Sequence, residues 1–236
     1  IMFNNCLVCE ALNPVVPGGN PRKRGFPPKW PDAEMAGAEA LTTAFIGTVL
    51  GYRSDKDIWA YFGRHWAAWF PHLGDRSTFV RQLAKLGHVK ALLHRPGAKR
   101  LRAFEAKGYL VDGFRIPVCH PKRVDRYTLF RGEADLGFCT SKEEDYFGFH
   151  GLVLIRKNMA DSRPLSLVAH RISVRRRVET VIGQLAERFS AERIGARKLW
   201  QWVTRLYRKV AAHTWCVLIN QSLGRPLLDF EGLVTV

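Results

Sequence analysis

Two acidic residues, Asp112 and Glu179, lie where their carboxylates could bind divalent metal ions. Asp112 follows an apolar run and precedes Gly113, and Glu179 lies in a later segment with helical spacing. One acid on a strand and one on a helix suit magnesium-dependent phosphoryl transfer, because Mg²⁺ takes oxygen ligands and two such ions activate the nucleophile and stabilise the leaving oxygen. Two ordinary alternatives stay open: Asp112 can serve a tight turn, and Glu179 can be a surface residue beside arginines.

A helix at about residues 175–190 is expected to carry Glu179. Its apolar stripe follows helical spacing, and consists of Val178, Val181, Ile182, Leu185 and Phe189. Because successive helical residues are about 100° apart, Glu179 lies roughly 90° from the centre of this stripe. Its carboxylate can therefore reach over the edge of a sheet on which the helix packs.

The strand that carries Asp112 is predicted as part of a hairpin. Residues 109–118 alternate between apolar and polar and contain Asp112-Gly113, a strong signal for a two-residue turn. Residues 146–155 predict a third strand. The acidic stretch 133–145 before it is interpreted as a solvated loop, and a polar loop is expected at 156–164.

Helices are expected on both sides of these strands. The N-terminal helices are predicted after Asp32, from Ser54 to before Pro71, and from Ser77 to about residue 95, and a last helix at about 197–222. Aromatic residues of the second helix could stack on bases, but the core is the favoured interpretation of such a stripe.

The charge of the chain indicates a polyanionic partner. There are 37 Lys and Arg against 21 Asp and Glu, which gives a net charge of +16. Nucleic acid is the default partner of so basic a protein, and an anionic membrane surface is the alternative. No apolar run reaches the length of a membrane-spanning helix. The basic side chains expected either to contact DNA or to form a solvated face are Arg175, Arg176, Arg177, Arg205, Arg208 and Lys209.

The five cysteines do not suggest a disulfide framework, because their number is odd and most are far apart. We therefore expect a reducing, cytoplasmic compartment. The pair Cys6-x-x-Cys9 is a weak zinc signal. No P-loop, Rossmann glycine pattern or serine nucleophile elbow is present. The first residue is Ile1, which leads us to expect that the natural chain starts earlier.

Several segments in a fixed order resemble transposases of the insertion sequence 982 family of bacterial insertion sequences. The resemblance extends over nearly the whole chain after about residue 25. It is carried by Pro27–Lys29, Leu50–Tyr52, Asp55–Lys56, Arg64–Trp66, Phe70–Arg76, Val111–His120, Leu129–Ala134, Tyr146–Gly151, Arg175–Leu185, Ala211–Thr214 and Leu223–Pro226.

This resemblance implies a DDE transposase on a ribonuclease-H-like core. Such enzymes hold two Mg²⁺ (or Mn²⁺) ions with two Asp and one Glu, cut DNA at the ends of the element and join the 3′-hydroxyl to target DNA. The first Asp corresponds to Asp112 and the Glu to Glu179, as catalytic residues and metal ligands. The implied partners are the terminal inverted repeats, target DNA and a second copy of the chain. The implied location is the bacterial cytoplasm, at the nucleoid.

The second Asp of the family has no counterpart. Only residues 152–178 separate the third predicted strand from Glu179, whereas a single strand–helix–strand unit takes about 30 residues or more. Asp161 is the one acid in this interval, and it lies in a polar loop. We therefore expect an internal deletion between Ile155 and Arg156, with Asp161 as a possible but loosely held replacement ligand.

The sequence thus predicts a mixed α+β protein. We expect an irregular basic arm at 1–31, a helical unit at 32–100 that either binds DNA or braces the core, and at 101–236 a ribonuclease-H-like transposase domain that lacks its central strands. Two functions remain open. One is DNA cleavage and strand transfer, impaired by the loss of the second Asp. The other is a non-catalytic remnant that binds element ends, or the product of a pseudogene.

Overall fold

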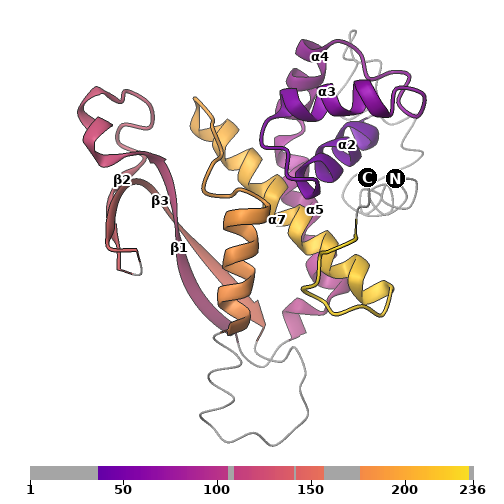
Figure 1. The fold of residues 1–236 in the computed structure, drawn as a ribbon. Helices are drawn as coiled ribbons and strands as arrows, with labels where there is room; N and C mark the ends of the chain where they lie inside the picture. The colour runs from indigo at the N-terminus through magenta and orange to yellow at the C-terminus, as the bar shows by residue number, and fades with distance from the viewer. Residues whose placement is uncertain (1–36, 106–108, 141, 157–175, 234–236) are drawn as a thin grey trace, which may run out of the picture.

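The computed structural model describes residues 37–105, 109–140, 142–156 and 176–233. N-terminal helices are followed by a three-stranded antiparallel sheet and by C-terminal helices, which confirms the expected mixed α+β class. In Figure 1 the N-terminal helices and the sheet lie on opposite sides of the long helix α7 (Leu199–Ser222). The arm at 1–31, Asp161 and Arg175 lie outside the described residues.

Four helices precede the sheet, and two of them begin at side-chain caps. Ser54 accepts a hydrogen bond from the backbone N–H of Asp57 at 3.1 Å, and Asp75 accepts from the N–H groups of Ser77 and Thr78. The helices are α2 (Gly37–Val49), α3 (Asp55–His65), α4 (Arg76–Lys85) and α5 (Gly87–Arg100).

The single helix predicted from Ser77 to residue 95 is wrong, because the structure has two helices that meet at Leu86. The second helix, α5, also continues past Pro96 to Arg100. Pro96 cannot donate to the carbonyl of Leu92, but Leu92 is exposed, so water can reach this side of the helix. The start of α5 packs closely on α7. A Cβ at Gly87 would lie 2.2 Å from Cγ2 of Thr204.

The sheet has the order β1-β3-β2 and is antiparallel throughout. Its strands are β1 (Tyr109–Cys119), β2 (Asp135–Cys139) and β3 (Glu144–Arg156). The third predicted strand corresponds to β3. The predicted hairpin within residues 109–118 is wrong, since these residues form one continuous strand. The solvated loop expected at 133–145 instead contains β2. Short 3₁₀ helices lie at Ala103–Glu105 (η1) and Pro121–Arg126 (η2).

The described residues after the gap at 157–175 begin as a helix at 176–183. This helix continues as one π-helical turn, η3 (Gln184–Arg188), and a loop leads to α7. Both C-terminal helices thus lie where the apolar spacing predicts them.

Two hydrophobic clusters organise the molecule, and α7 belongs to both. The sheet cluster is formed by β1, β3, the helix at 176–183 and the first half of α7, including Trp202. The helical cluster is formed by α2 to α5 and the second half of α7, including Trp215. The expected domain boundary at residue 100 falls between α5 and β1. Helix α7, however, packs into both the helical cluster before this boundary and the sheet cluster after it.

Candidate functional site

Asp112 lies within β1 and not in a turn. Its Cα pairs with that of Val153, its side chain is exposed, and its Oδ1 accepts a hydrogen bond from the N–H of Gly113 at 2.8 Å. Gly113 does not form a turn, but leaves space for a side chain of the neighbouring strand. A Cβ there would lie 2.1 Å from Nε2 of His150, because the imidazole fills that space.

The face of β1 that carries Asp112 is the one covered by the C-terminal helix. Side chains alternate along a strand, so Asp112 shares its face with Phe114 and Ile116. Phe114 and Ile116 are buried in the sheet cluster with Val178 and Val181 of the helix at 176–183. Asp112 therefore lies at the exposed end of the layer between this strand and this helix.

Glu179 lies at the same end of that layer. It is exposed and directly follows the buried Val178 in the first turn of the described helix. Figure 1 shows this helix starting beside the end of the sheet where Tyr109 of β1 pairs with Arg156 of β3. Strand and helix thus place Asp112 and Glu179 near the same end of the sheet.

The residues described at this end do not complete a site for two Mg²⁺ ions. Within the described ranges, no group of three or more His, Cys, Asp or Glu side chains is placed to hold a metal ion. The expected replacement ligand, Asp161, lies outside those ranges. Two carboxylates alone do not fix the geometry that phosphoryl transfer demands, so no metal-dependent step follows from these residues.

The basic residues predicted to contact DNA divide into two groups. Arg176 is exposed and Arg177 is half-buried on the helix at 176–183. Arg208 and Lys209, in contrast, are 0% and 1% exposed. The prediction of phosphate contacts by these two residues is therefore wrong, because their charged groups do not reach the surface.

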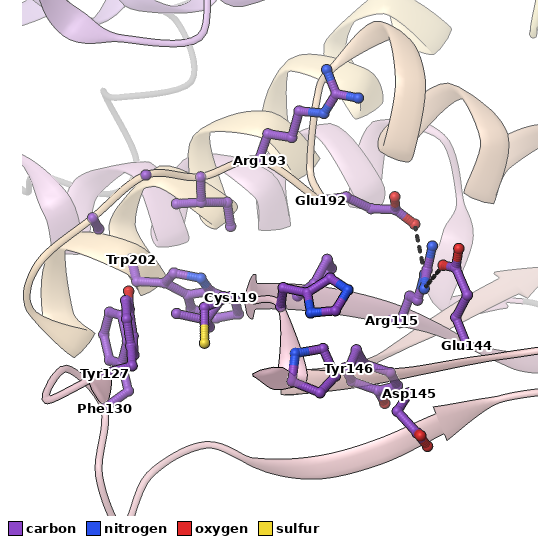
Figure 2. Close-up of a pocket in the computed structure, with 17 residues that line it drawn as sticks. Arg115, Cys119, Tyr127, Phe130, Glu144, Asp145, Tyr146, Glu192, Arg193 and Trp202 are labelled. Carbon is purple, nitrogen blue, oxygen red and sulfur yellow. Dashed lines mark hydrogen bonds and ion pairs between the residues drawn. The ribbon is translucent and has the colours of Figure 1, made fainter. Parts of the chain in front are cut away.

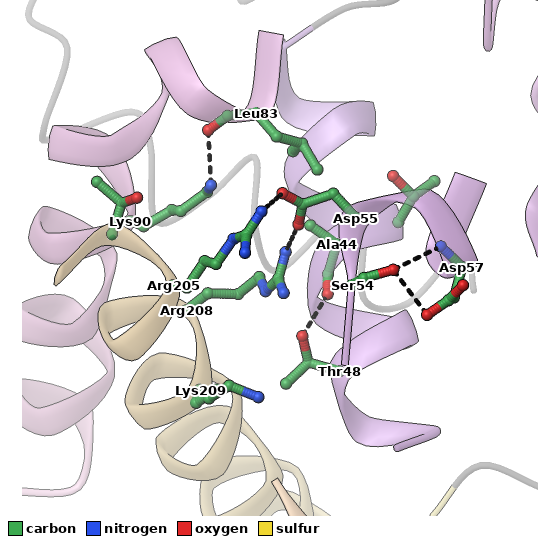
Figure 3. Close-up of polar contacts among 12 residues, drawn as sticks. Ala44, Thr48, Ser54, Asp55, Asp57, Leu83, Lys90, Arg205, Arg208 and Lys209 are labelled. Carbon is green, nitrogen blue, oxygen red and sulfur yellow. Dashed lines mark hydrogen bonds and ion pairs between the residues drawn. The ribbon is translucent and has the colours of Figure 1, made fainter. Parts of the chain in front are cut away.

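Arg208 and Lys209 instead form a cationic network with the buried Lys90 and the half-buried Arg205 around Asp55 (Figure 3). The carboxylate of Asp55 accepts from Arg208 and pairs with Arg205 at 3.5 Å. The two lysines donate to backbone carbonyls. Lys90 bonds the carbonyl of Leu83 at 2.6 Å and Lys209 bonds that of Phe189.

The charges of this network perturb one another strongly. Burial, with repulsion from Arg208 second, lowers the pKa of Lys90 and of Lys209 to about 7. Burial alone would raise the pKa of Asp55, but the positive charges of Arg208, Lys90 and Arg205 outweigh it and lower that pKa to about 2. The network lies where the two halves of α7 meet, and its ion pairs hold α7 to α3.

A signal for this burial was present in the sequence. In α7, Trp202, Arg205, Arg208, Ala212 and Trp215 recur at intervals of three or four residues. This spacing places Arg208 in the middle of an apolar stripe that faces the core. Asp55, its partner, is far away in sequence and carries no such signal.

A separate pocket of about 500 Å³ opens between the sheet and the loop before α7 (Figure 2). Tyr127, Phe130 and Trp202 lie together at one end of it, and Arg115 and Glu144 lie at the other, below Glu192. Arg115 pairs with Glu144 at 2.8 Å and with Glu192 at 3.9 Å. His120, Asp145 and Arg193 also line the pocket.

Exposed basic residues flank this pocket on two segments. One is η2, which directly follows the lining residue His120. The other is the loop that supplies Glu192 and Ala196 to the lining. The sequence interpretation had not selected these residues, which are Lys122, Arg123, Arg126, Arg193, Arg197 and Lys198.

None of the helices in the described ranges is both long and apolar enough to cross a lipid bilayer. No family model, no curated protein and no solved structure matches this chain.

Proposed function

We propose that this protein is a DNA-binding relative of DDE transposases in which strand-transfer chemistry is impaired. The observation that carries the proposal is the charge. The chain has a net charge of +16, and exposed basic residues of η2 and of the loop before α7 flank one pocket. Clustered basic residues of this kind neutralise phosphates, which is the main source of affinity for DNA.

The arrangement of Asp112 and Glu179 supports a transposase origin with a truncated ribonuclease-H-like core. The strand that carries Asp112 pairs with β3, and the helix that carries Glu179 packs on the same sheet. The family resemblance implies a core in which one strand and one later helix carry metal-binding carboxylates, and Asp112 and Glu179 lie on such a strand and such a helix. With no third ligand among the described residues, binding of DNA is the function that these residues support best.

DNA binding is tested by gel retardation with a short duplex of arbitrary sequence at several salt concentrations. Neutralisation of about six phosphates gives a slope of about −5 for log K against log salt. Changing Lys122, Arg123 and Arg126 together to Gln removes up to three of these contacts, and should make the slope shallower by about 0.9 for each. The matched control changes Lys56, Arg64 and Lys85 to Gln, three exposed residues of α3 and α4 on the far side of α7 from η2.

Equal loss of affinity in both triple variants would mean that net charge alone matters and that η2 is not a contact. Absence of retardation in low salt would refute the proposed function. Catalysis is tested separately by nicking of a supercoiled plasmid with Mg²⁺ or Mn²⁺. We expect no nicking above that of Asp112→Ala. Nicking that is lost in both Asp112→Ala and Glu179→Ala would show that a working metal site survives.

A further inference from the structure

The pocket of Figure 2 differs in charge from the rest of this basic protein. Among its lining residues, Glu144 and Glu192 both pair with Arg115, and Figure 2 shows Arg193 and Asp145 pointing away from the cavity. Glu192 also pairs with the exposed Lys142 at 3.7 Å. The two carboxylates beside Arg115 balance its charge, so the interior does not attract a phosphate group. The ligand that suits this interior is therefore uncharged, although the surface around it is cationic.

The walls indicate a flat ligand with hydrogen-bonding groups on its edge. One end is aromatic, with the half-buried ring of Tyr127 beside Phe130 and Trp202. The other end offers carboxylate acceptors and one donor in need of a partner. The Nε of Arg115 is buried, and no hydrogen-bond partner for it exists among the described residues.

We propose that this pocket binds a single unpaired guanine base of a nucleic-acid strand. Guanine presents the O6 and N7 acceptors that arginine recognises and, on its Watson–Crick edge, the N1–H and N2–H₂ donors that a carboxylate can accept. Arg115 would donate to O6, and Glu192 or Glu144 would accept from N1 and N2. The base would stack on Tyr127, as unpaired bases do on aromatic side chains.

Basic side chains on both sides of the pocket are placed to contact the phosphates of the same strand. Lys122 and Arg123 follow His120 on one side of the pocket, and Arg197 and Lys198 follow Ala196 on the other. These four side chains are exposed. A strand whose phosphates lie along them can place one base in the pocket without bringing a phosphate near the carboxylates. The inference rests on the proposed DNA binding and adds a base preference to it.

The test uses single-stranded oligothymidylates that are identical except for one central base. We expect the oligonucleotide with a central guanine to bind about tenfold more tightly than those with adenine, cytosine or thymine, the scale on which one set of hydrogen bonds to a base edge discriminates against the wrong base. Tyr127→Ala and Glu192→Gln should each abolish this preference. Tyr127→Phe keeps the aromatic ring and should retain the preference for guanine. Trp69→Ala removes an exposed aromatic residue of the N-terminal helices and should retain this preference as well.

Free 2′-deoxyguanosine separates this inference from the proposed function, because it has no phosphate. Saturable binding of 2′-deoxyguanosine by equilibrium dialysis, lost in Tyr127→Ala, would support the pocket even if no oligonucleotide is retarded. Affinities for the four central bases within twofold of one another, or a guanine preference that survives in Tyr127→Ala, would overturn the inference.

Discussion

Replacing Asp55 by Asn should destabilise the fold far more than its position at the start of α3 suggests. Asp55 is the acid that pairs with Arg205 and Arg208, and Lys90 lies close enough to lower its pKa. Asparagine keeps the shape of the side chain but removes its charge. The change therefore leaves the buried guanidinium of Arg208 without a counter-charge.

The size of the effect follows from burial and from the pKa of Asp55. A carboxyl pKa lowered from 3.8 to about 2 corresponds to about 2 kcal/mol of stability at neutral pH. Breaking a buried ion pair by removing one partner typically costs about 3–5 kcal/mol. We therefore expect Asp55→Asn to lower the free energy of unfolding by about 2–5 kcal/mol, a large share of the roughly 5–15 kcal/mol of a typical domain.

Urea unfolding of the full chain, followed by tryptophan fluorescence at neutral pH, measures this loss. Asp125→Asn is the matched control, because Asp125 is exposed and its change should stay within about 0.5 kcal/mol. The double variant Asp55→Asn with Arg208→Met should recover part of the loss, since it also removes the uncompensated charge. A loss below about 1 kcal/mol, or no recovery in the double variant, would refute the view that Asp55 neutralises this network.

Two further outcomes follow from the same structure. Stability should rise between pH 7 and pH 9, by roughly 2 kcal/mol for each buried lysine. The reason is that Lys90 and Lys209 have a pKa of about 7 when folded and about 10.5 when unfolded, so the unfolded chain holds more protons in this range. Urea unfolding at both pH values should show Lys90→Met losing about half of this rise, and a flat profile in the wild type would contradict the burial of these charges. Gly113→Ala should cost at most about 1 kcal/mol, because its Cβ would meet the imidazole of His150, an exposed side chain that can turn aside. His150→Ala should relieve most of that cost, and equal costs in both backgrounds would mean that the imidazole is not the obstacle.

The spacing of apolar residues predicted those elements whose conformation depends mainly on neighbouring residues in the sequence. Helix α7 and the cap of α3 at Ser54 follow from spacing and side-chain type. The Asp112-Gly113 pair misled because a glycine between apolar residues has two uses: a tight turn, or space for a side chain of the neighbouring strand. Only the position of His150 distinguishes them, and local sequence does not contain the pairing of β1 with β3.

The sequence predicted the position of some residues of the candidate site but not their long-range partners. The apolar stripe around Glu179 correctly places it on the border of a buried face, because Val178 and Val181 are buried and Glu179 is exposed. The role of Arg208 was not predictable from charge alone. Its partner Asp55 is far away in sequence, and that pairing exists only once α3 and α7 have met. The pocket likewise depends on β1 and the loop before α7 coming together.

The dual packing of α7 constrains the order in which the chain folds during its synthesis. Helices α2 to α5 emerge from the ribosome first, yet their shared core lacks Trp215 and its neighbours on α7 until residue 222 has been made. Helices α2 to α5 therefore cannot complete their core before α7 has been synthesised, unlike chains whose N-terminal domain folds alone. Contacts so distant in sequence slow folding. During this interval the apolar faces of α2 to α5 are open to chaperones.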